Sequence, residues 1–554
     1  MKKSIIYTAT ALLVSLTACD KFLDTMPDNR TEIDTPEKAK ALVGDAYAGR
    51  NFMVVAEFSG DNMDNNRALI SSDLNRSDQN NWNWRDNDES NNDSQDQIWR
   101  SNWSAISAAN QALEAIEKMG GKDDPELSEI YGEALLARAW SHFNLANIFC
   151  KAYNDETSGT DLGLPYMETP EVGLSPQYER GNLADYYAHI AADIEEGLKY
   201  VGNNYAVPKY HFTPQSGHAF AARFYLYYGK WEKAVEHANL VLGDNPAAVL
   251  RDYNALQTNY PAMADQKHAF NSPNEPANLL LQTGYGQAPQ FWGTDTGAYK
   301  HFAFTTYIAE TESYMAPTPW LPSGVKAANF NWTPHQYGTL LTFWSFWKLS
   351  YYFEYTDPVS GTGYKRTVLA ALTTEMTLLD RAEAYIHLSR YDKALEDINT
   401  WVNHLYKGGF NVTEEMVNNF YDNMDYYLWY KPTQKKELHP KKPIEIGDKT
   451  HENFLHLILN MRRTESMAWG LRWFDIKRYG IVIYRREVDS NGKVYKVTDM
   501  LDVDDEARAI QIPAKAIDGG FAPNPRPYGY QVTSRDDYAA QRGFPQIAPG
   551  YEMN

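Results

Sequence analysis

Two stretches of the sequence combine aromatic rings with side chains that donate and accept hydrogen bonds. Residues 285–355 hold 20 aromatic residues in 71 positions, against 14% in the whole chain, so this stretch is unusually rich in rings. Residues 59–97 are rich in asparagine and aspartate and contain the run Asn-Trp-Asn-Trp-Arg at positions 81–85. Aromatic rings stack on the apolar CH faces of sugars, while amides, carboxylates and guanidinium groups bind hydroxyls. The chemistry indicated is non-covalent binding of a neutral, hydroxyl-rich ligand.

The backbone of both stretches is predicted to be irregular. Asn and Asp side chains compete for backbone hydrogen bonds, and the prolines between residues 317 and 334 exclude a long helix. Some of the rings should therefore line a surface built from loops. The candidate ligand-binding residues are Asp61, Asp64, Asn81, Trp82, Asn83, Trp84, Arg85, Trp292, Trp320 and Trp332. For each ring the alternative is a place in the core, which is the interpretation for Trp344, Trp347, Tyr351, Tyr352, Trp469, Trp473 and Phe474.

Helices are predicted to carry these loops. Thr35 followed by Pro36 favours a helix start, because the hydroxyl accepts a free amide and proline lacks one. Apolar periodicity predicts further helices from about 99 to a Gly-Gly cap at 120–121, over 125–149 and over 183–201. The short link between the first two of these favours an antiparallel pair.

A repeat is the clearest sign of organisation. Residues 215–246 match a tetratricopeptide repeat, with Ala222, Gly229, Trp231 and Pro246 at the expected places. A second, degenerate copy lies in residues 378–401. Because a long, ring-rich segment separates the copies, we expect a helical scaffold interrupted by a large insertion.

The N-terminus reads as a lipoprotein signal. Two lysines precede a short apolar run, and Leu16-Thr17-Ala18-Cys19 resembles a bacterial lipobox, so cleavage before Cys19 and its lipidation are expected. The alternative is a plain signal peptide with an incidental cysteine. Since the run is too short to span a bilayer, the mature protein should be anchored to the membrane rather than cross it.

Composition and motifs narrow the function. A formal net charge of −20 excludes nucleic acid as an expected partner. Two cysteines make no disulfide framework, and the 13 histidines show no metal-ligand spacing, so no metal or cofactor is expected. Common nucleophile, zinc and phosphate-loop motifs are missing, and 72 acidic residues make chance carboxylate pairs inevitable. We therefore expect a binding protein and not an enzyme.

Several motifs together resemble the SusD/RagB family of outer-membrane lipoproteins. The residues from Cys19 to Asp24 and the following Pro27 are similar to the family's start. Residues 463–480 resemble its C-terminal signature, although the second acid of that signature is missing here. Gly163-Leu-Pro-Tyr166, Ile512-Pro513 and Asn524-Pro525 are also similar, so the resemblance covers essentially the whole mature chain.

The resemblance implies a mainly α fold, SusD-like, in which a tetratricopeptide scaffold carries a large, loop-rich insertion with the ligand face. It implies a cell-surface lipoprotein of the outer membrane that captures oligo- or polysaccharide for a SusC-like TonB-dependent β-barrel. Its ligand sites combine early and middle loops, so Trp82 or Trp84 is expected to share one surface with Trp292, Trp320 or Trp332. The alternatives are a peptide-binding member and, less favoured, a lipid-anchored glycoside hydrolase.

The predicted organisation has three parts: a signal peptide over residues 1–18, a lipidated tether over 19–36 and a SusD-like domain over 37–554. Within the domain, the scaffold occupies about 37–250 and 370–402, the ligand-binding region about 251–369, and a C-terminal region 403–554.

Overall fold

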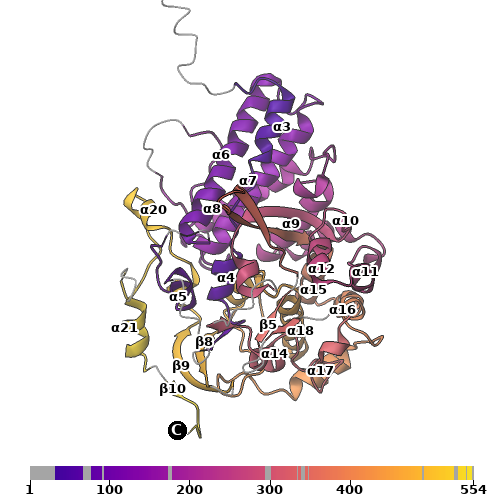
Figure 1. Cartoon of the computed structure of the whole chain (residues 1–554), viewed down its shortest axis with the longest axis vertical. Helices are drawn as coiled ribbons and strands as arrows, with labels where there is room; N and C mark the ends of the chain where they lie inside the picture. The colour runs from indigo at the N-terminus through magenta and orange to yellow at the C-terminus, as the bar shows by residue number, and fades with distance from the viewer. Residues whose placement is uncertain are drawn as a thin grey trace, which may run out of the picture.

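The fold comes from a computed structural model, which describes residues 32–66, 76–89, 91, 93–171, 178–293, 301–332, 335–337, 343–346, 348–489, 492–529, 534–543 and 546–551. Figure 1 shows a bundle of long helices from the N-terminal part of the chain, joined to a half of loops, short helices and strands. The predicted signal peptide and Cys19 lie outside the described residues. Within the described ranges, every helix is too short or too polar to cross a bilayer.

The N-terminal helices form where capping and periodicity predict them. Thr35 Oγ1 accepts a hydrogen bond from Lys38 N at 3.3 Å and begins α3. The α6 and α7 helices pack against each other, and Gly120 ends α6 with a φ of 135°. The bounds of this group are α3 Pro36–Gly44, α4 Met53–Ser59, α5 Arg76–Trp82, α6 Gln95–Met119, α7 Ser128–Phe149 and α8 Leu183–Gly197.

Both tetratricopeptide copies are helix pairs. The first consists of α9 (Pro214–Tyr227) and α10 (Trp231–Leu242), and Gly229 turns the chain between them with a φ of 71°. The second consists of α15 (Thr374–His387) and α16 (Tyr391–Leu405). Because α10 packs against α15, the two copies form one stack despite the insertion between them. The predicted mainly helical, interrupted scaffold is confirmed.

The insertion is built from short elements around a three-stranded antiparallel sheet of order β2-β7-β6. Trp344 is buried, as predicted, but Tyr352 is 36% exposed, because β6 is the edge strand of this sheet. The prediction that Tyr352 lies in the core was therefore wrong. Trp347 lies outside the described residues. The elements are η2 Pro246–Ala248, α11 Tyr253–Asn259, α12 Met263–Phe270, β2 Asn278–Tyr285, α13 Ala288–Trp292, β3 Phe302–Ala303, α14 Thr306–Glu312, η3 Ala327–Asn329, β4 His335–Tyr337, β5 Phe343–Ser345, β6 Tyr352–Asp357 and β7 Thr362–Thr373.

A second sheet ties the early loop region to the C-terminal part. Its order is β10-β9-β8-β1-β3, and β1 (Asp64–Asn65) pairs in parallel with β8, far along the chain. The other C-terminal elements are α17 Glu414–Asp422, α18 Lys449–Glu465, α19 Leu471–Arg478, β8 Ile483–Val488, β9 Val494–Leu501, η4 Glu506–Arg508, α20 Ala514–Asp518, α21 Ser534–Gln541 and β10 Gln546–Ile547.

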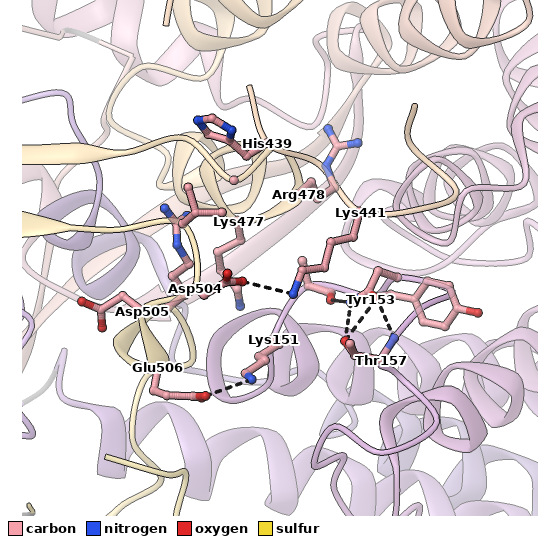
Figure 2. A pocket seen from close by; sticks show the side chains of 15 residues that line it. Lys151, Tyr153, Thr157, His439, Lys441, Lys477, Arg478, Asp504, Asp505 and Glu506 are labelled. Carbon is pink, nitrogen blue, oxygen red and sulfur yellow. Dashed lines mark hydrogen bonds and ion pairs between the residues drawn. The ribbon is translucent and has the colours of Figure 1, made fainter. Parts of the chain in front are cut away.

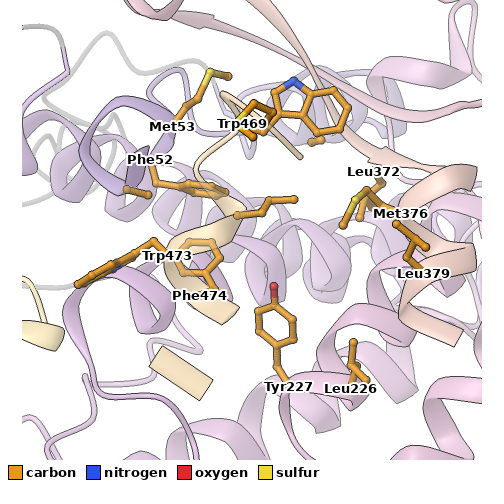
Figure 3. Packing of buried hydrophobic residues seen from close by; sticks show 14 of the residues in the cluster. Phe52, Met53, Leu226, Tyr227, Leu372, Met376, Leu379, Trp469, Trp473 and Phe474 are labelled. Carbon is orange, nitrogen blue, oxygen red and sulfur yellow. The ribbon is translucent and has the colours of Figure 1, made fainter. Parts of the chain in front are cut away.

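The signature around residues 463–480 lies in the main core. Figure 3 shows Trp469, Trp473 and Phe474 among apolar side chains from α4, α9 and α15. Phe474 contacts Phe52 at 5.0 Å between ring centroids, and Trp473 is fully buried. The structural role predicted for these three rings is confirmed.

Candidate ligand-binding site

The tryptophans of the predicted early loop lie inside the molecule. Trp82 and Trp84 are 2% and 5% exposed. Trp82 stacks on Phe302 with ring centroids 4.3 Å apart, and the Arg485 guanidinium lies 4.1 Å from Trp82 and 3.8 Å from Trp84. Trp84 Nε1 also donates to Ser59 O at 2.9 Å. For Trp82 and Trp84 the structure thus shows the alternative, a place in the core, because residues of the C-terminal sheet cover their faces.

The rings of the insertion divide between two places. The ring centroid of Phe58 lies 5.4 Å from that of Trp292 and 6.0 Å from that of Phe302. Because Phe302 also stacks on Trp82, Trp292 and Trp82 belong to one aromatic cluster. Trp320 packs on Tyr406 at 5.6 Å, and Trp332 packs near Tyr253 at 6.0 Å. All three tryptophans are buried, with 2–8% of their surface exposed. The structure therefore brings Trp82 and Trp292 together but as packing residues.

Both predicted aspartates belong to a buried ionic layer beneath the loops. Asp61 accepts hydrogen bonds from Lys436 Nζ at 2.8 Å and from two Arg472 nitrogens at 3.0 Å. Burial raises the pKa of Asp61, but the positive charges of Arg463, Arg472 and Lys436 outweigh it and hold that pKa well below its usual value.

Asp64 pairs with Arg486 Nε at 2.8 Å, and Thr305 donates to its second oxygen at 3.1 Å. The hydrogen-bonding capacity of both aspartates is thus directed into the protein.

The polar residues of the early loop differ in exposure. Asn81 is buried and accepts from Gln95 Nε2 at 2.6 Å. Asn83 and Arg85 are half-buried, and Arg85 Nε donates to Asp536 of α21 at 2.9 Å. Segments 67–75 and 294–300, which are neighbours of this region in the sequence, lie outside the described residues. Ligand binding by the predicted residues stays a prediction, and Asn83 and Arg85 are its surface candidates.

A cavity with rings at its surface lies on the outer side of α6, and we call it the α6 cavity. Its volume is about 320 Å³, near the lower end of the range for small-molecule sites. The wall across from the helix comes from described residues between 165 and 171, from Tyr178 and from Phe521. The described lining residues are Trp99, Arg100, Trp103, Ser104, Ile106, Ser107, Asn110, Pro165, Met167, Thr169, Glu171, Tyr178 and Phe521.

Buried polar groups hold the opposite wall in place. Asn110 Nδ2 donates to Met167 O at 2.9 Å and Thr169 O at 3.3 Å, and Arg138 donates to Glu168 O at 3.0 Å. Arg138 is itself fixed by two 2.7 Å hydrogen bonds to Asp193. Because α6, α7 and α8 supply these groups, the loop that forms this wall is anchored to the helical bundle.

The α6 cavity combines stacking surfaces with hydrogen-bonding groups. Trp103, Tyr178 and Phe521 are half-buried, and Trp103 packs edge-on against Trp99 at 5.5 Å. Ser104, Ser107 and Thr169 add hydroxyls around the rings. Of the described lining residues, Glu171 is the single carboxylate. Hydrolysis of a glycosidic bond by the usual mechanism needs two carboxylates, and the described lining provides one.

The residue pattern along the chain did not predict this cavity. Its signal is the spacing of Trp99, Trp103 and Ser107, which places two indoles and a hydroxyl on one stripe of α6. The recurrence of Trp99, Ile106 and Leu113 every seven residues indicates a helix but not a cavity on its surface. The contributions of Tyr178 and Phe521 depend on tertiary contacts, which local spacing does not reveal.

A metal site is not apparent in the described part of the chain, where no three His, Cys, Asp or Glu side chains gather closely enough to hold an ion.

Comparison with known proteins identifies related folds. A family model described as "Starch-binding associating with outer membrane", SusD-like, matches residues 21–226. A SusD superfamily protein of Bacteroides vulgatus superposes with a TM-score of 0.61 at 17% identity, covering 91% of this chain and 100% of that one.

A SusD superfamily protein of Bacteroides thetaiotaomicron superposes with a TM-score of 0.57 at 17% identity, covering 90% of this chain and 100% of that one. A protein of Bacteroides vulgatus described as a "putative sugar binding protein" superposes with a TM-score of 0.59 at 16% identity, covering 91% of this chain and 100% of that one. No curated protein matches.

Proposed function

We propose that the chain belongs to the SusD family and is a glycan-binding lipoprotein of the outer cell surface, on the basis of its match to the family model over residues 21–226 and of its fold. In this proposal it captures oligo- or polysaccharide and delivers it to a SusC-like TonB-dependent β-barrel. The family description, which combines starch binding with the outer membrane, supports the ligand class and the location. The lipobox-like run ending at Cys19 supports attachment through lipid.

The α6 cavity carries the proposal on the structural side. Its half-buried rings can stack on the CH face of a sugar, and the serine and threonine hydroxyls can bind the ring hydroxyls. The hydrogen bonds from Asn110 and Arg138 that anchor one wall reduce the entropy that a ligand must overcome on binding.

We expect the protein to bind and release its ligand without altering the ligand chemically. A single carboxylate among the described lining residues favours capture without hydrolysis, so incubation with a bound glycan should release no reducing ends. Turnover that one carboxylate substitution abolishes would instead identify a lipid-anchored glycosidase.

A binding screen tests the function. The chain from Asp20 onward, which keeps every described residue, is titrated with plant, host and microbial glycans and with peptide mixtures. Retention of an oligosaccharide supports the proposal, whereas retention of peptides alone would identify a peptide-binding protein of the same fold.

Matched variants locate the site. Trp103→Ala and Tyr178→Ala should each weaken glycan binding about tenfold, which corresponds to ~1.4 kcal/mol. Trp231→Ala, a change of another half-buried tryptophan that stacks on His387 away from the cavity, is the control. If Asn83→Ala and Arg85→Ala abolish binding while the cavity variants do not, the ligand contacts belong to the early loop.

Delivery to a barrel needs its own experiment. The proposed partnership predicts that the lipidated protein co-purifies with a TonB-dependent β-barrel from outer membranes. Recovery of the protein alone under conditions that preserve such complexes would argue against the partnership without affecting glycan binding.

A further inference from the structure

A second cavity, which we call the cationic cavity, shares no lining residue with the α6 cavity. Figure 2 shows its lining from close by. The cavity is enclosed by the segment after α7, by residues 439–441, by the end of α19 and by residues 503–508. Its volume is about 360 Å³. Four segments that are distant in sequence thus meet around one polar space.

The lining carries more positive than negative charge. Five lysine or arginine side chains and His439 line the cavity, against three carboxylates. The chain as a whole has a formal net charge of −20, so a local excess of cations departs from its general composition. Such an excess in a partly enclosed space attracts anions.

The carboxylates are held by partners at or beyond the lining. Glu506 lies 3.2 Å from Lys151, and Asp504 lies 3.1 Å from Lys441, as Figure 2 shows. Asp505 accepts from Arg535 at 2.7 Å. The two exposed lysines of the lining, Lys151 and Lys441, are therefore paired with carboxylates of the same lining.

Two buried cations of the lining form no ion pair with a described residue. Lys477 Nζ donates to the carbonyl oxygens of Asn147 at 2.7 Å and Cys150 at 2.6 Å. Arg508 donates to three other carbonyl oxygens, at 2.7–3.1 Å. By contrast, Arg478 pairs with Glu383 and Asp475.

The carbonyl bonds position the two cations without using all their donors. A lysine ammonium has three N–H groups and an arginine guanidinium has five. The described hydrogen bonds use two of the three on Lys477 and three of the five on Arg508. The carbonyls of Asn147 and Cys150 lie at the end of α7, and that of Ile476 lies in the last turn of α19, where a cation is favourable.

We propose that the cationic cavity binds a small oxyanion, namely a carboxylate, sulfate or phosphate group, through Lys477 and Arg508. The exposed Lys151 and Lys441 then form its outer rim. The proposal concerns a site separate from the α6 cavity and does not depend on glycan binding there.

The environment of Lys477 agrees with this assignment. Burial lowers the pKa of Lys477 to about 7, since a charge without a counter-ion is unfavourable in the interior. An oxyanion beside it would restore the charged form. A neutral ligand could accept the free N–H groups but would not compensate the charge.

Calorimetric titration of the chain from Asp20 onward tests the proposal. The probes are inorganic sulfate, inorganic phosphate and glucuronate, with glucose as the neutral counterpart of glucuronate. We expect the anions to bind and glucose not to bind at this site. The inorganic ions and glucuronate together distinguish a free anion from an acidic sugar as the source of the oxyanion.

Two surface substitutions of opposite sign separate binding from folding. Lys441→Gln removes a rim cation and should weaken anion binding about threefold, whereas Asp504→Asn removes a competing carboxylate and should strengthen it about threefold. Both side chains are largely exposed, at 41% and 79%, so neither change should unfold the protein. Lys233→Gln, which alters an exposed lysine paired with Glu195, is the control and should have no effect.

Anion binding that changes in opposite directions in the two variants supports the proposal. Absence of anion binding, glucose binding that the two variants shift as they shift anion binding, or changes of anion binding with the same sign in both variants would overturn it.

Discussion

Substitution of Asp61 by asparagine separates the two roles that this residue could have. The sequence predicts a ligand contact, whereas the structure makes its carboxylate the shared partner of Lys436 and Arg472 in a fully buried layer. Arg463 lies 3.6 Å from the same carboxylate. Asp61→Asn would leave three buried positive charges without their nearest compensating anion.

The expected effect on stability is large. Removing one partner of a buried ion pair costs about 3–5 kcal/mol. For a chain of this length the entropy of unfolding is about 1 kcal/mol/K, so the melting temperature should fall by about 4 °C. Asp425→Asn is the matched control, because Asp425 pairs with Lys431 in solvent, with 72% and 64% of the two side chains exposed. The Asp425→Asn variant should have the same melting temperature as the wild-type protein.

Calorimetric melting and glycan titration on the same preparations test this reasoning. We expect Asp61→Asn to lose stability and, below its melting temperature, to keep the wild-type affinity for glycan. A variant that melts normally but no longer binds glycan would show that Asp61 faces the ligand and that the ionic layer does not need it.

Two further substitutions test local features of the fold. Burial raises the pKa of Asp93 to about 6 against the opposing hydrogen bond from Gln287 N, so its contribution to stability is present below about pH 4 and lost as pH rises through 6. Asp93→Asn should therefore gain about 2 kcal/mol in unfolding free energy relative to wild type between pH 4 and pH 8, and parallel denaturation profiles would contradict the assignment. Gly229→Ala should destabilise the first helix repeat by more than 2 kcal/mol, because a Cβ there would meet the Pro443 ring on a backbone with φ of 71°. Gly361→Ala, at φ of 69° in open space, isolates the backbone strain, so equal losses in chemical denaturation would argue against the clash.

The scaffold could be predicted because its signals are local. The Thr35 cap, the Gly120 end and the Gly229 turn each depend on a few neighbouring residues, and the structure places each one as expected. The pairing of α10 with α15 also follows once two copies of one repeat are recognised, since such repeats bury their surface by stacking.

The candidate site could not be predicted in the same way. Trp82 and Trp84 lie in a polar segment, and nothing near them in sequence indicates that Arg485 and Phe302 cover their faces. Asp61 gives no local sign that Arg472 is its partner. Burial of these side chains is set by contacts across several hundred residues, which composition and periodicity do not report.

Titration of one retained oligosaccharide against the wild-type chain and the Trp103→Ala variant tests the central claim most directly. The account predicts that the wild-type protein binds the glycan and leaves it intact, and that the variant binds it about tenfold more weakly while melting as a folded protein. Equal affinity in the two proteins would contradict the α6 cavity as the site, and failure of every glycan to bind the wild-type chain would contradict the proposed function.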